Sequence, residues 1–413
     1  MAKGHRRIAA LDIGTTEVRA IVSEIIEDGQ LEIIGVGRAP SRGVRKGVVV
    51  NIEATVDAIR QAVEETENMS GLPVDSAYVG LGGAQMRGLN SRGVIAISRR
   101  NREITDEEVH RVVEQARAVS VPTDREIIDV LPQEFTVDGQ DGIINPIGFL
   151  GMRLEAAVHI MTSPITARQN VISSLNRAGI HVDDTVVNHV AAAESTLTPD
   201  EKEYGAAVID IGADITNLTI INRDAIRHTA VFPMGGNSFT NDIAVGLKTP
   251  VPEAERLKIH EGCALSNLLA DSERGQMVQV PSGNGRTPRA LSRQILCEIL
   301  QPRAEEIFGH VYEEIQRAGF DRQILSSAVL VGGGSLMDGI VELAENILEL
   351  PARHGMPNYV GGLMDEIDNP AYATVVGTML YGFHKQMTQR KAVNRDGASR
   401  TRGILDWLLR RNS

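Results

Sequence analysis

Aromatic residues, cysteines and long apolar runs are all scarce in this chain of 413 residues. Only 3% of the residues are aromatic, which argues against the stacking surfaces that bind single-stranded nucleic acid. Cys263 and Cys297 are too few for a disulfide framework and are expected to be buried thiols in a reducing cytoplasm. The N-terminal segment reaches Asp12 after four apolar residues, so we expect no signal peptide, and no run is long enough for a transmembrane helix.

Positive charge is also in deficit, except near the C-terminus. The net charge of −12 argues against attraction of the whole molecule to DNA or acidic lipid, so we expect no nucleic-acid partner. Residues 385–413 contain eight Lys or Arg against two Asp, a net +6 that leaves −18 for the rest of the chain. This asymmetry predicts a distinct function for the tail.

Two similar stretches, residues 8–20 and 206–220, organise the chain. Each is an apolar run that ends in Asp-Ile-Gly, turns on small residues and resumes with alternating apolar positions. This pattern predicts a hairpin whose glycine lets a ligand approach the backbone. Two such hairpins indicate two similar domains that face each other across a cleft and grip a phosphate chain, with Asp12 and Asp210 holding a hydrated Mg²⁺.

A glycine triplet strengthens this interpretation. Residues 327–340 read as an apolar strand followed by Gly332, Gly333 and Gly334, with a helix expected to start at Ser335. Bare backbone before a helix can carry a flat or anionic group. In this order, two hairpins and a strand–Gly-Gly-Gly–helix unit resemble the actin-like ATPase superfamily, which implies ATP in the cleft with the glycines under the adenosine.

The segment from about residue 85 to 162 differs in character from its surroundings. A capping box at Thr105 predicts a helix through Ala118, and strands are expected at 94–97, 126–130, 133–137 and 154–161. We interpret the segment as a small α+β unit inserted into the first domain. Most inserted units of this kind are recognition surfaces, since they lie away from the cleft.

Four longer segments carry a sharper resemblance. They are SRGVRKGVVVNIEATVDAIRQAVE from Ser41, LPQEFTVDGQDGIINPIG from Leu131, RLEAAVHIMTSP from Arg153 and FPMGGNSFTNDIA from Phe232. These segments look like the FtsA family, the bacterial division proteins of the actin superfamily, and matching segments run in family order through nearly the whole chain. The resemblance implies self-assembly into filaments, binding of the FtsZ C-terminal peptide, and contacts of later division proteins with the inserted unit.

The fold class expected is therefore α/β: an actin-like ATPase fold of two similar domains around a nucleotide cleft, with a small inserted subdomain and a C-terminal amphipathic helix. Domain 1 is expected over 1–84, 163–195 and 351–385, with the inserted subdomain at 85–162. Domain 2 is expected over 196–228 and 296–350, with a small lobe at 229–295 for the nucleotide base and the FtsZ tail. A flexible basic linker is expected at 386–402 and a membrane-targeting helix at 403–413.

The resemblance also implies individual site residues. Glu255 and Lys258 share a helix face and would contact ribose and adenine, although a solvated charge pair is the usual interpretation of such spacing. Arg293 would meet the partly acidic FtsZ peptide. The full set expected to bind ATP or ADP is Asp12, Gly14, Thr15, Thr16, Asp210, Gly212, Thr216, Gly235, Gly236, Glu255, Lys258, Gly332, Gly333, Gly334 and Ser335.

Some positions depart from the family pattern. The second phosphate turn is usually DIGGGTTD, but here Ala213 and Asp214 replace two glycines, which places a carboxylate where phosphate oxygens are expected. Glu17 stands where many relatives have Lys, and Arg19 on the same strand face would compensate. Asn188 cannot act as an ionised base. Either Asp214 helps to hold Mg²⁺, or phosphate binding is weak; we favour slow or absent hydrolysis, with the nucleotide as a structural ligand.

The last eleven residues, GILDWLLRRNS, follow a polar and basic stretch. On a helical wheel their apolar residues occupy one arc, a pattern typical of a helix that lies in the membrane interface. A terminal helix packed on the body is the alternative. The linker, the flanking arginines and the acidic body favour reversible binding to anionic membrane, which several copies on one filament would stabilise. The membrane-binding residues expected are Ile404, Leu405, Trp407, Leu408, Leu409, Arg410 and Arg411.

The function expected is that of a peripheral adaptor at the division site, which ties FtsZ filaments to the cytoplasmic face of the inner membrane. Two alternatives remain. A carbohydrate kinase of the same superfamily needs a sugar pocket with a catalytic Asp, for which no motif stands out. An actin-fold pilus-assembly adaptor shares the small insert, but TNDIA and the terminal helix count against it.

Overall fold

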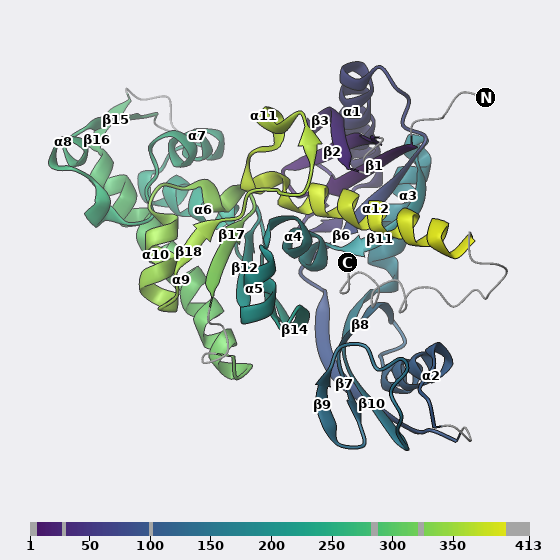
Figure 1. Cartoon of the computed structure of the whole chain (residues 1–413). Coiled ribbons are helices and arrows are strands. Elements are labelled where there is room, and N and C mark those ends of the chain that lie inside the picture. The colour runs from purple at the N-terminus through teal and green to yellow at the C-terminus, as the bar shows by residue number, and fades with distance from the viewer. Residues whose placement is uncertain (1–5, 27–29, 99–101, 282–287, 321–325, 394–413) are drawn as a thin grey trace.

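The computed structural model describes residues 6–26, 30–98, 102–281, 288–320 and 326–393. Figure 1 shows two domains side by side, with a smaller subdomain that extends from the first. Each domain is built on its own sheet. The chain starts in domain 1, crosses to domain 2 after α4 (Asn188–Thr196) and returns between β18 (Ala352–His354) and β19 (Gly361–Gly362).

Domain 1 has a six-stranded sheet in the order β11-β6-β1-β2-β3-β19. Helices α1 and α3 cover one face, while α12 covers the other. The elements are β1 (Arg6–Ile13), β2 (Glu17–Ile25), β3 (Leu31–Pro40), β4 (Val44–Arg45), β5 (Val48–Val49), α1 (Ile52–Ser70), β6 (Ser76–Leu81), α3 (Ile165–Ala178), β11 (His181–Val187), α4 (Asn188–Thr196), β19 (Gly361–Gly362), α11 (Met364–Ile367), the 3₁₀ turn η3 (Pro370–Tyr372) and α12 (Ala373–Val393).

The alternation of apolar residues explains why both faces of this sheet are covered. In β1, Ala9 and Leu11 pack in the core beside α1, whereas Ile8 and Ala10 pack in the core beside α12. Successive side chains of a strand point to opposite faces, so a strand that is apolar at every position needs a layer on each side. The end of β1, which carries Asp12, is thereby held rigidly between two helical layers.

Domain 2 repeats the plan with a five-stranded sheet in the order β14-β13-β12-β17-β18. A small lobe with its own two-stranded sheet extends from it. The elements are α5 (Pro199–Tyr204), β12 (Ala206–Ile211), β13 (Thr216–Asn222), β14 (Ala225–Phe232), α6 (Gly236–Leu247), α7 (Val251–Glu261), the 3₁₀ turn η1 (Ser266–Leu268), α8 (Asp271–Arg274), β15 (Met277–Val280), β16 (Arg289–Ser292), α9 (Arg293–Arg317), β17 (Ser327–Val331), the 3₁₀ turn η2 (Gly333–Leu336), α10 (Ile340–Leu348) and β18 (Ala352–His354).

The inserted subdomain is a four-stranded antiparallel sheet in the order β7-β10-β8-β9, with one helix on it. Its elements are β7 (Arg87–Ala96), α2 (Asp106–Arg117), β8 (Arg125–Val137), β9 (Gln140–Ile143) and β10 (Arg153–Pro164). The capping box at Thr105 is present and α2 ends one residue before the predicted end. The two strands predicted at 126–130 and 133–137 form one strand, because Pro132 lies at a register shift where the ladder is interrupted.

Two local predictions need correction. The helix expected at Ser335 is a 3₁₀ turn, and the α-helix starts only at Ile340, after Gly339 with φ of 72°. The segment predicted as a linker from 386 is helical to Val393, because residues 386–393 contain good helix formers and neither Gly nor Pro; residues 394–402 lie outside the described part.

Two helices of domain 1 that also pack on domain 2, α4 and α12, lie directly against each other. A Cβ on Gly377 of α12 would lie 1.7 Å from the carbonyl oxygen of Ala191 in α4, so only glycine allows this approach. The buried Ser195 hydroxyl donates to the carbonyl oxygen of Ala373 at 2.7 Å. The base of the cleft is therefore a close helix–helix contact.

Candidate nucleotide-binding cleft

Both predicted hairpins are present, and their turns are closed in the same way. In the first, β1 pairs with β2 and the Gly14 N–H donates to the Glu17 carbonyl oxygen at 3.0 Å. In the second, β12 pairs with β13 and the Gly212 N–H donates to the Ile215 carbonyl oxygen at 2.9 Å. An added Cβ would lie 2.7 Å from Glu17 O at Gly14 and 3.1 Å from Ile215 O at Gly212. The two turns thus present equivalent backbone to the cleft.

The carboxylates of Asp12 and Asp210 lie at the ends of β1 and β12. Burial raises the pKa of Asp12. Burial also raises the pKa of Asp210 to about 6, and the charge of Asp12 adds to this effect. The Asn217 amide offsets part of the cost by donating to Asp210 Oδ2 at 3.0 Å. Two buried carboxylates that repel each other are a suitable place for a divalent cation.

Two buried amide oxygens support the same interpretation. Asn188 hydrogen-bonds to Asp12 and Asn217 to Asp210, and each leaves its own Oδ1 without a hydrogen-bond donor. Oxygen atoms with free lone pairs suit the hydration shell of Mg²⁺. Among the described residues, no three His, Cys, Asp or Glu side chains converge in a way that could hold a metal ion by themselves.

The glycine triplet lies against the second hairpin. A Cβ on Gly332, whose φ is 82°, would come 2.4 Å from Asp210 Oδ1, and one on Gly334 would come 2.8 Å from the Ile211 carbonyl oxygen. Gly333 is different: it is exposed, and a Cβ there would meet nothing within 4 Å. Gly332 and Gly334 therefore pack closely against β12, while the backbone of Gly333 is exposed.

The remaining predicted glycines and the charge pair also come together. The Gly236 N–H donates to the Gly212 carbonyl oxygen at 2.8 Å, and a Cβ on Gly235 would lie 2.4 Å from that oxygen. Lys258 Nζ lies 2.7 Å from Glu255 Oε2 and donates to the Gly236 carbonyl oxygen at 3.2 Å. The Lys258 side chain is largely buried and that of Glu255 is 37% exposed, and the pair bridges α7 to the start of α6 beside the second turn.

The predicted hydroxyl residues divide into two groups. Thr15 and Thr16 lie in the first turn, where Thr15 Oγ1 accepts the Gly47 N–H at 3.3 Å. Thr216 and Ser335 are fully buried, and their hydroxyls donate to the carbonyl oxygens of Met234 and Gly332 at 2.9 and 2.7 Å. These two hydroxyls hold the site together from inside.

The departures from the family pattern have defined partners. Arg19 Nη2 lies 2.6 Å from Glu17 Oε2, so the arginine neutralises the unusual glutamate as expected. Asp214 Oδ2 accepts the backbone N–H of Lys46 at 2.8 Å, and Asp214 Oδ1 accepts Asn237 Nδ2 at 2.8 Å. The carboxylate thus connects the second turn of domain 2 to the main chain of domain 1.

Arg293, predicted as a partner contact, lies at the start of α9 in the small lobe. Its residue exposure is only 9%, and its guanidinium donates to the Glu261 carbonyl oxygen at 3.0 Å. It is paired with Glu273 at 3.2 Å and with Asp338 at 3.0 Å. The structure therefore does not bring it into the nucleotide cleft but uses it to join α8 and the turn before α10 to α9.

The predicted membrane-binding residues, Ile404, Leu405, Trp407, Leu408, Leu409, Arg410 and Arg411, lie outside the described residues. Of the helices that the structure describes, none combines the length and the apolar character needed to cross a bilayer.

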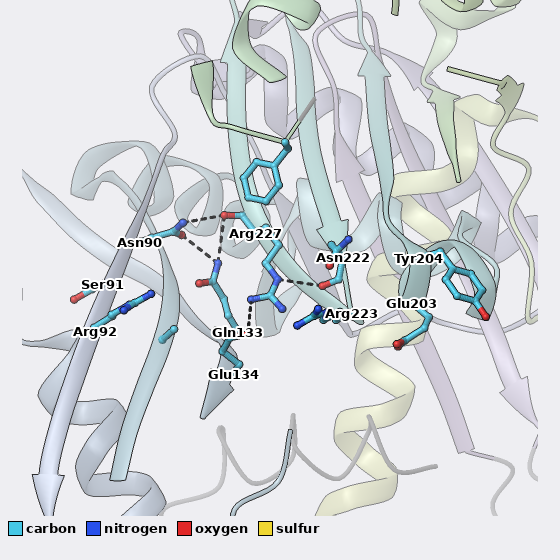
Figure 2. Close-up of a pocket in the computed structure, with 12 residues that line it drawn as sticks. Asn90, Ser91, Arg92, Gln133, Glu134, Glu203, Tyr204, Asn222, Arg223 and Arg227 are labelled. Carbon is cyan, nitrogen blue, oxygen red and sulfur yellow. Dashed lines mark hydrogen bonds and ion pairs between the residues drawn. The ribbon is translucent and has the colours of Figure 1, made fainter. Parts of the chain in front are cut away.

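A second polar site lies between the inserted subdomain and domain 2. A cavity of about 860 Å³ lies between β7 and β8 on one side and the β13–β14 turn on the other, and Figure 2 shows the residues that line it. Arg227 pairs with Glu134 at 3.3 Å and donates to the Asn222 carbonyl oxygen at 3.1 Å (Figure 2). Gln133 Nε2 donates to the Arg227 carbonyl oxygen at 3.3 Å (Figure 2). The cavity wall is therefore built by both parts of the chain.

A buried histidine fixes the floor of this junction. His159 of β10 is 1% exposed; its Nδ1 lies 2.6 Å from Asn90 Oδ1 and its Nε2 lies 2.9 Å from Thr229 Oγ1. Burial, together with the charges of His228 and His189, lowers the pKa of His159 to about 3. A neutral imidazole thus bonds to both sides of the junction.

Comparison with known proteins identifies the family. The model of the cell division protein FtsA matches residues 207–377, and that of the SHS2 domain inserted in FtsA matches residues 83–162. The chain is 46% identical over 381 residues to the cell division protein FtsA of Pseudomonas aeruginosa, covering 92% of this chain and 90% of the relative. The chain belongs to the FtsA family. Identity to FtsA of Escherichia coli K12 is 35% over 419 residues, 100% of this chain and 98% of the relative.

Solved structures agree on the fold. The PilM–PilN type IV pilus biogenesis complex matches with a TM-score of 0.67 and 15% identity, covering 91% of this chain and 98% of that one. MreB5 of Spiroplasma citri bound to AMPPNP matches with a TM-score of 0.56 and 15% identity, covering 94% and 98%. The actin-like fold with an inserted subdomain is thus confirmed, and the chain is a cell division protein of the FtsA family.

Sequence reasoning missed several residues around the FtsA-family cleft. Asn217 lies directly opposite Asp210 in the hairpin register, as Arg19 lies opposite Asp12. The sequence analysis assigned Arg19 only to Glu17, and counting back across the predicted turns would have found its place opposite Asp12 and that of Asn217 opposite Asp210. No comparable signal pointed to Lys46, whose contact with Asp214 joins residues 168 positions apart.

Proposed function

We propose that this FtsA-family protein binds ADP or ATP with Mg²⁺, assembles into actin-like filaments, and ties FtsZ filaments to the cytoplasmic face of the inner membrane at the division site. The observation that carries the nucleotide part is the pair of equivalent hairpin turns, with Asp12 and Asp210 at their ends and the exposed Gly333 nearby. Two structures of MreB5 from Spiroplasma citri with the same fold are described as bound to ADP and to AMPPNP, which supports a nucleotide here.

The residues assigned to the nucleotide have separate tasks in this proposal. The turns at Gly14 and Gly212 meet the phosphates, and Asp12 and Asp210 hold Mg²⁺ through water. Glu255 and Lys258 meet the ribose and adenine, since their charged ends lie beside Gly236. Bound Mg²⁺ would neutralise the phosphate charge.

We propose that hydrolysis is slow or absent. Asn188 carries an amide and cannot accept a proton from an attacking water as a carboxylate can. Asp214 adds negative charge to the phosphate turn. A binding titration with and without Mg²⁺, followed by a turnover assay, tests this: brisk turnover with tight Mg²⁺-dependent binding would refute it.

The membrane part of the proposal rests on the sequence of residues 403–413. One apolar face with a tryptophan and flanking arginines suits an anionic interface. A single short helix binds reversibly, so a filament that presents many copies would bind far more firmly. Assembly and membrane attachment are therefore coupled in this proposal.

Two partner sites belong to the proposal. The FtsZ C-terminal peptide would bind the small lobe at Arg293, where its carboxylates would replace those of Glu273 or Asp338, whose side chains are 46% and 71% exposed. Later division proteins would bind the inserted subdomain, for which the cavity of Figure 2 is the candidate site.

Co-sedimentation with anionic liposomes and FtsZ tests the adaptor function. We expect the full chain to carry FtsZ filaments into the liposome pellet. A chain lacking residues 403–413 should still bind FtsZ filaments but leave both proteins in the supernatant. Liposome binding that survives this deletion would contradict the assignment of the membrane segment.

The alternatives have less support. A carbohydrate kinase would require a sugar pocket beside the cleft, and the cavity of Figure 2 lies instead at the inserted subdomain. The pilus adaptor has support from the PilM–PilN fold match at 15% identity, against 46% identity to FtsA of Pseudomonas aeruginosa.

A further inference from the structure

A short turn of domain 1 touches both hairpin turns of the cleft. Lys46 and Gly47 have φ values of 51° and 70°, so both lie in the left-handed region. The Gly47 N–H donates to Thr15 Oγ1 in the first hairpin turn, and the preceding N–H, of Lys46, donates to Asp214 Oδ2 in the second. Consecutive backbone N–H groups in such turns commonly bind anions.

The two hairpin turns differ in what they offer at equivalent positions. The first reads Gly-Thr-Thr, with hydroxyls at Thr15 and Thr16, and the second reads Gly-Ala-Asp, with a methyl group at Ala213 and a carboxylate at Asp214. Hydroxyls can donate hydrogen bonds to phosphate oxygens, whereas an ionised carboxylate only accepts. The second turn therefore contains an anion of its own, the carboxylate of Asp214.

Both oxygens of that anion already have donors. Oδ2 accepts the Lys46 N–H and Oδ1 accepts the Asn237 amide, each at 2.8 Å. The carboxylate is thus held between the domain 1 main chain and the first turn of α6. In the proposed nucleotide site, a terminal phosphate held between the two turns would make this connection; without nucleotide, the Asp214 side chain makes it.

We infer that Asp214 is a resident anion that latches the two domains together across the phosphate turns and selects for ADP over ATP. This inference rests on the proposed nucleotide site and specifies its ligand. Because the latch needs no terminal phosphate, closure of the cleft does not depend on whether ATP or ADP is present. A third phosphate would have to displace or face a negative charge that is already held in place.

Titration calorimetry with ADP and with a non-hydrolysable ATP analogue, both with Mg²⁺, tests the selectivity. We expect the full chain to bind ADP about tenfold or more tightly than the analogue, since one fixed like charge near a phosphate has an effect of at least this order. Asp214→Asn keeps the shape and removes the charge, so it should raise analogue affinity about tenfold and change ADP affinity less than threefold. Asp200→Asn removes an exposed charge from α5 and should change neither.

Hydrogen exchange without nucleotide tests the latch by itself. Asp214→Ala should speed exchange at the Lys46 amide about tenfold, while the amides in the interior of α1 stay protected. If the full chain binds neither nucleotide, the proposed nucleotide site fails and selectivity with it. If it binds both but Asp214→Asn shifts them equally, or if Lys46 exchange is unchanged in Asp214→Ala, the inference on Asp214 is overturned while the nucleotide site stands.

Discussion

Adjacent glycines of the triplet allow a sharp test of the cleft, because the structure gives them opposite surroundings. Gly332→Ala puts a Cβ on a residue with φ 82° and ψ 161°, a conformation almost exclusive to glycine, 2.4 Å from Asp210 Oδ1 and 2.6 Å from the Ile211 carbonyl oxygen. Such backbone costs about 1–3 kcal/mol for alanine, and a forced shift of packed atoms costs about 1–3 kcal/mol more. We therefore expect the free energy of unfolding to fall by about 2–6 kcal/mol.

Gly333→Ala is the matched control for stability, since its Cβ would meet nothing within 4 Å and its backbone is not left-handed. Its unfolding free energy should stay within about 0.5 kcal/mol of the parent, as for other exposed sites. The added methyl group would instead occupy the space assigned to adenosine. We expect ADP affinity to fall about tenfold or more.

Urea unfolding followed by circular dichroism, together with ADP titration on the same samples, separates the two effects. Equal stability of the two variants would show that Gly332 does not lie against β12 as described. An unchanged ADP affinity in Gly333→Ala would show that the nucleotide does not bind at this face of the triplet.

Three further outcomes are expected. Because burial raises the native pKa of Asp210 from 3.8 to about 6, its ionisation lowers the unfolding free energy of the ligand-free protein by up to about 3 kcal/mol as the pH rises from 4 to 6. In urea unfolding, Asp210→Asn should remove this pH dependence of stability, and Mg²⁺ should reduce it. Because the native pKa of His159 is lowered from 6.5 to about 3, the unfolded state gains a proton that the native state does not, and the unfolding free energy falls by about 2 kcal/mol between pH 6.5 and 5. His159→Gln should reduce this loss of stability in acid, and an unchanged loss would show that another group causes it. Arg293→Ala should lower the unfolding free energy of the small lobe by about 1–3 kcal/mol, because its hydrogen bonds to charged groups are lost. Arg293→Gln should restore part of this stability but none of the affinity for the FtsZ peptide, as measured by fluorescence anisotropy.

The parts of the fold that follow from local pattern could be predicted from the sequence. The hairpins at Asp12 and Asp210 combine an apolar strand with a glycine at a position where only a small residue fits, and both signals lie within a dozen residues. The capping box at Thr105 is similarly local. Such elements depend on neighbours in the chain, so one sequence is enough to find them.

Contacts between distant parts of the chain could not be predicted in this way. The sequence indicated that Asp214 was unusual, but only the domain arrangement brings it to the Lys46 amide. Likewise Arg293 is a surface-type residue by composition, and its burial follows from the packing of α9 against the small lobe. The extension of α12 to Val393 differs from the prediction for another reason: a polar, aperiodic stretch predicts a linker, but no residue in 386–393 breaks a helix.

The contact of α4 with α12 at Gly377 has a mechanical consequence for the whole molecule. Both helices belong to domain 1, and Ala192, Ala193 and Ala373 beside this contact pack in one core with β12 and β17 of domain 2. A larger side chain at position 377 would therefore push α4 and α12 apart and disturb the surface against which domain 2 packs.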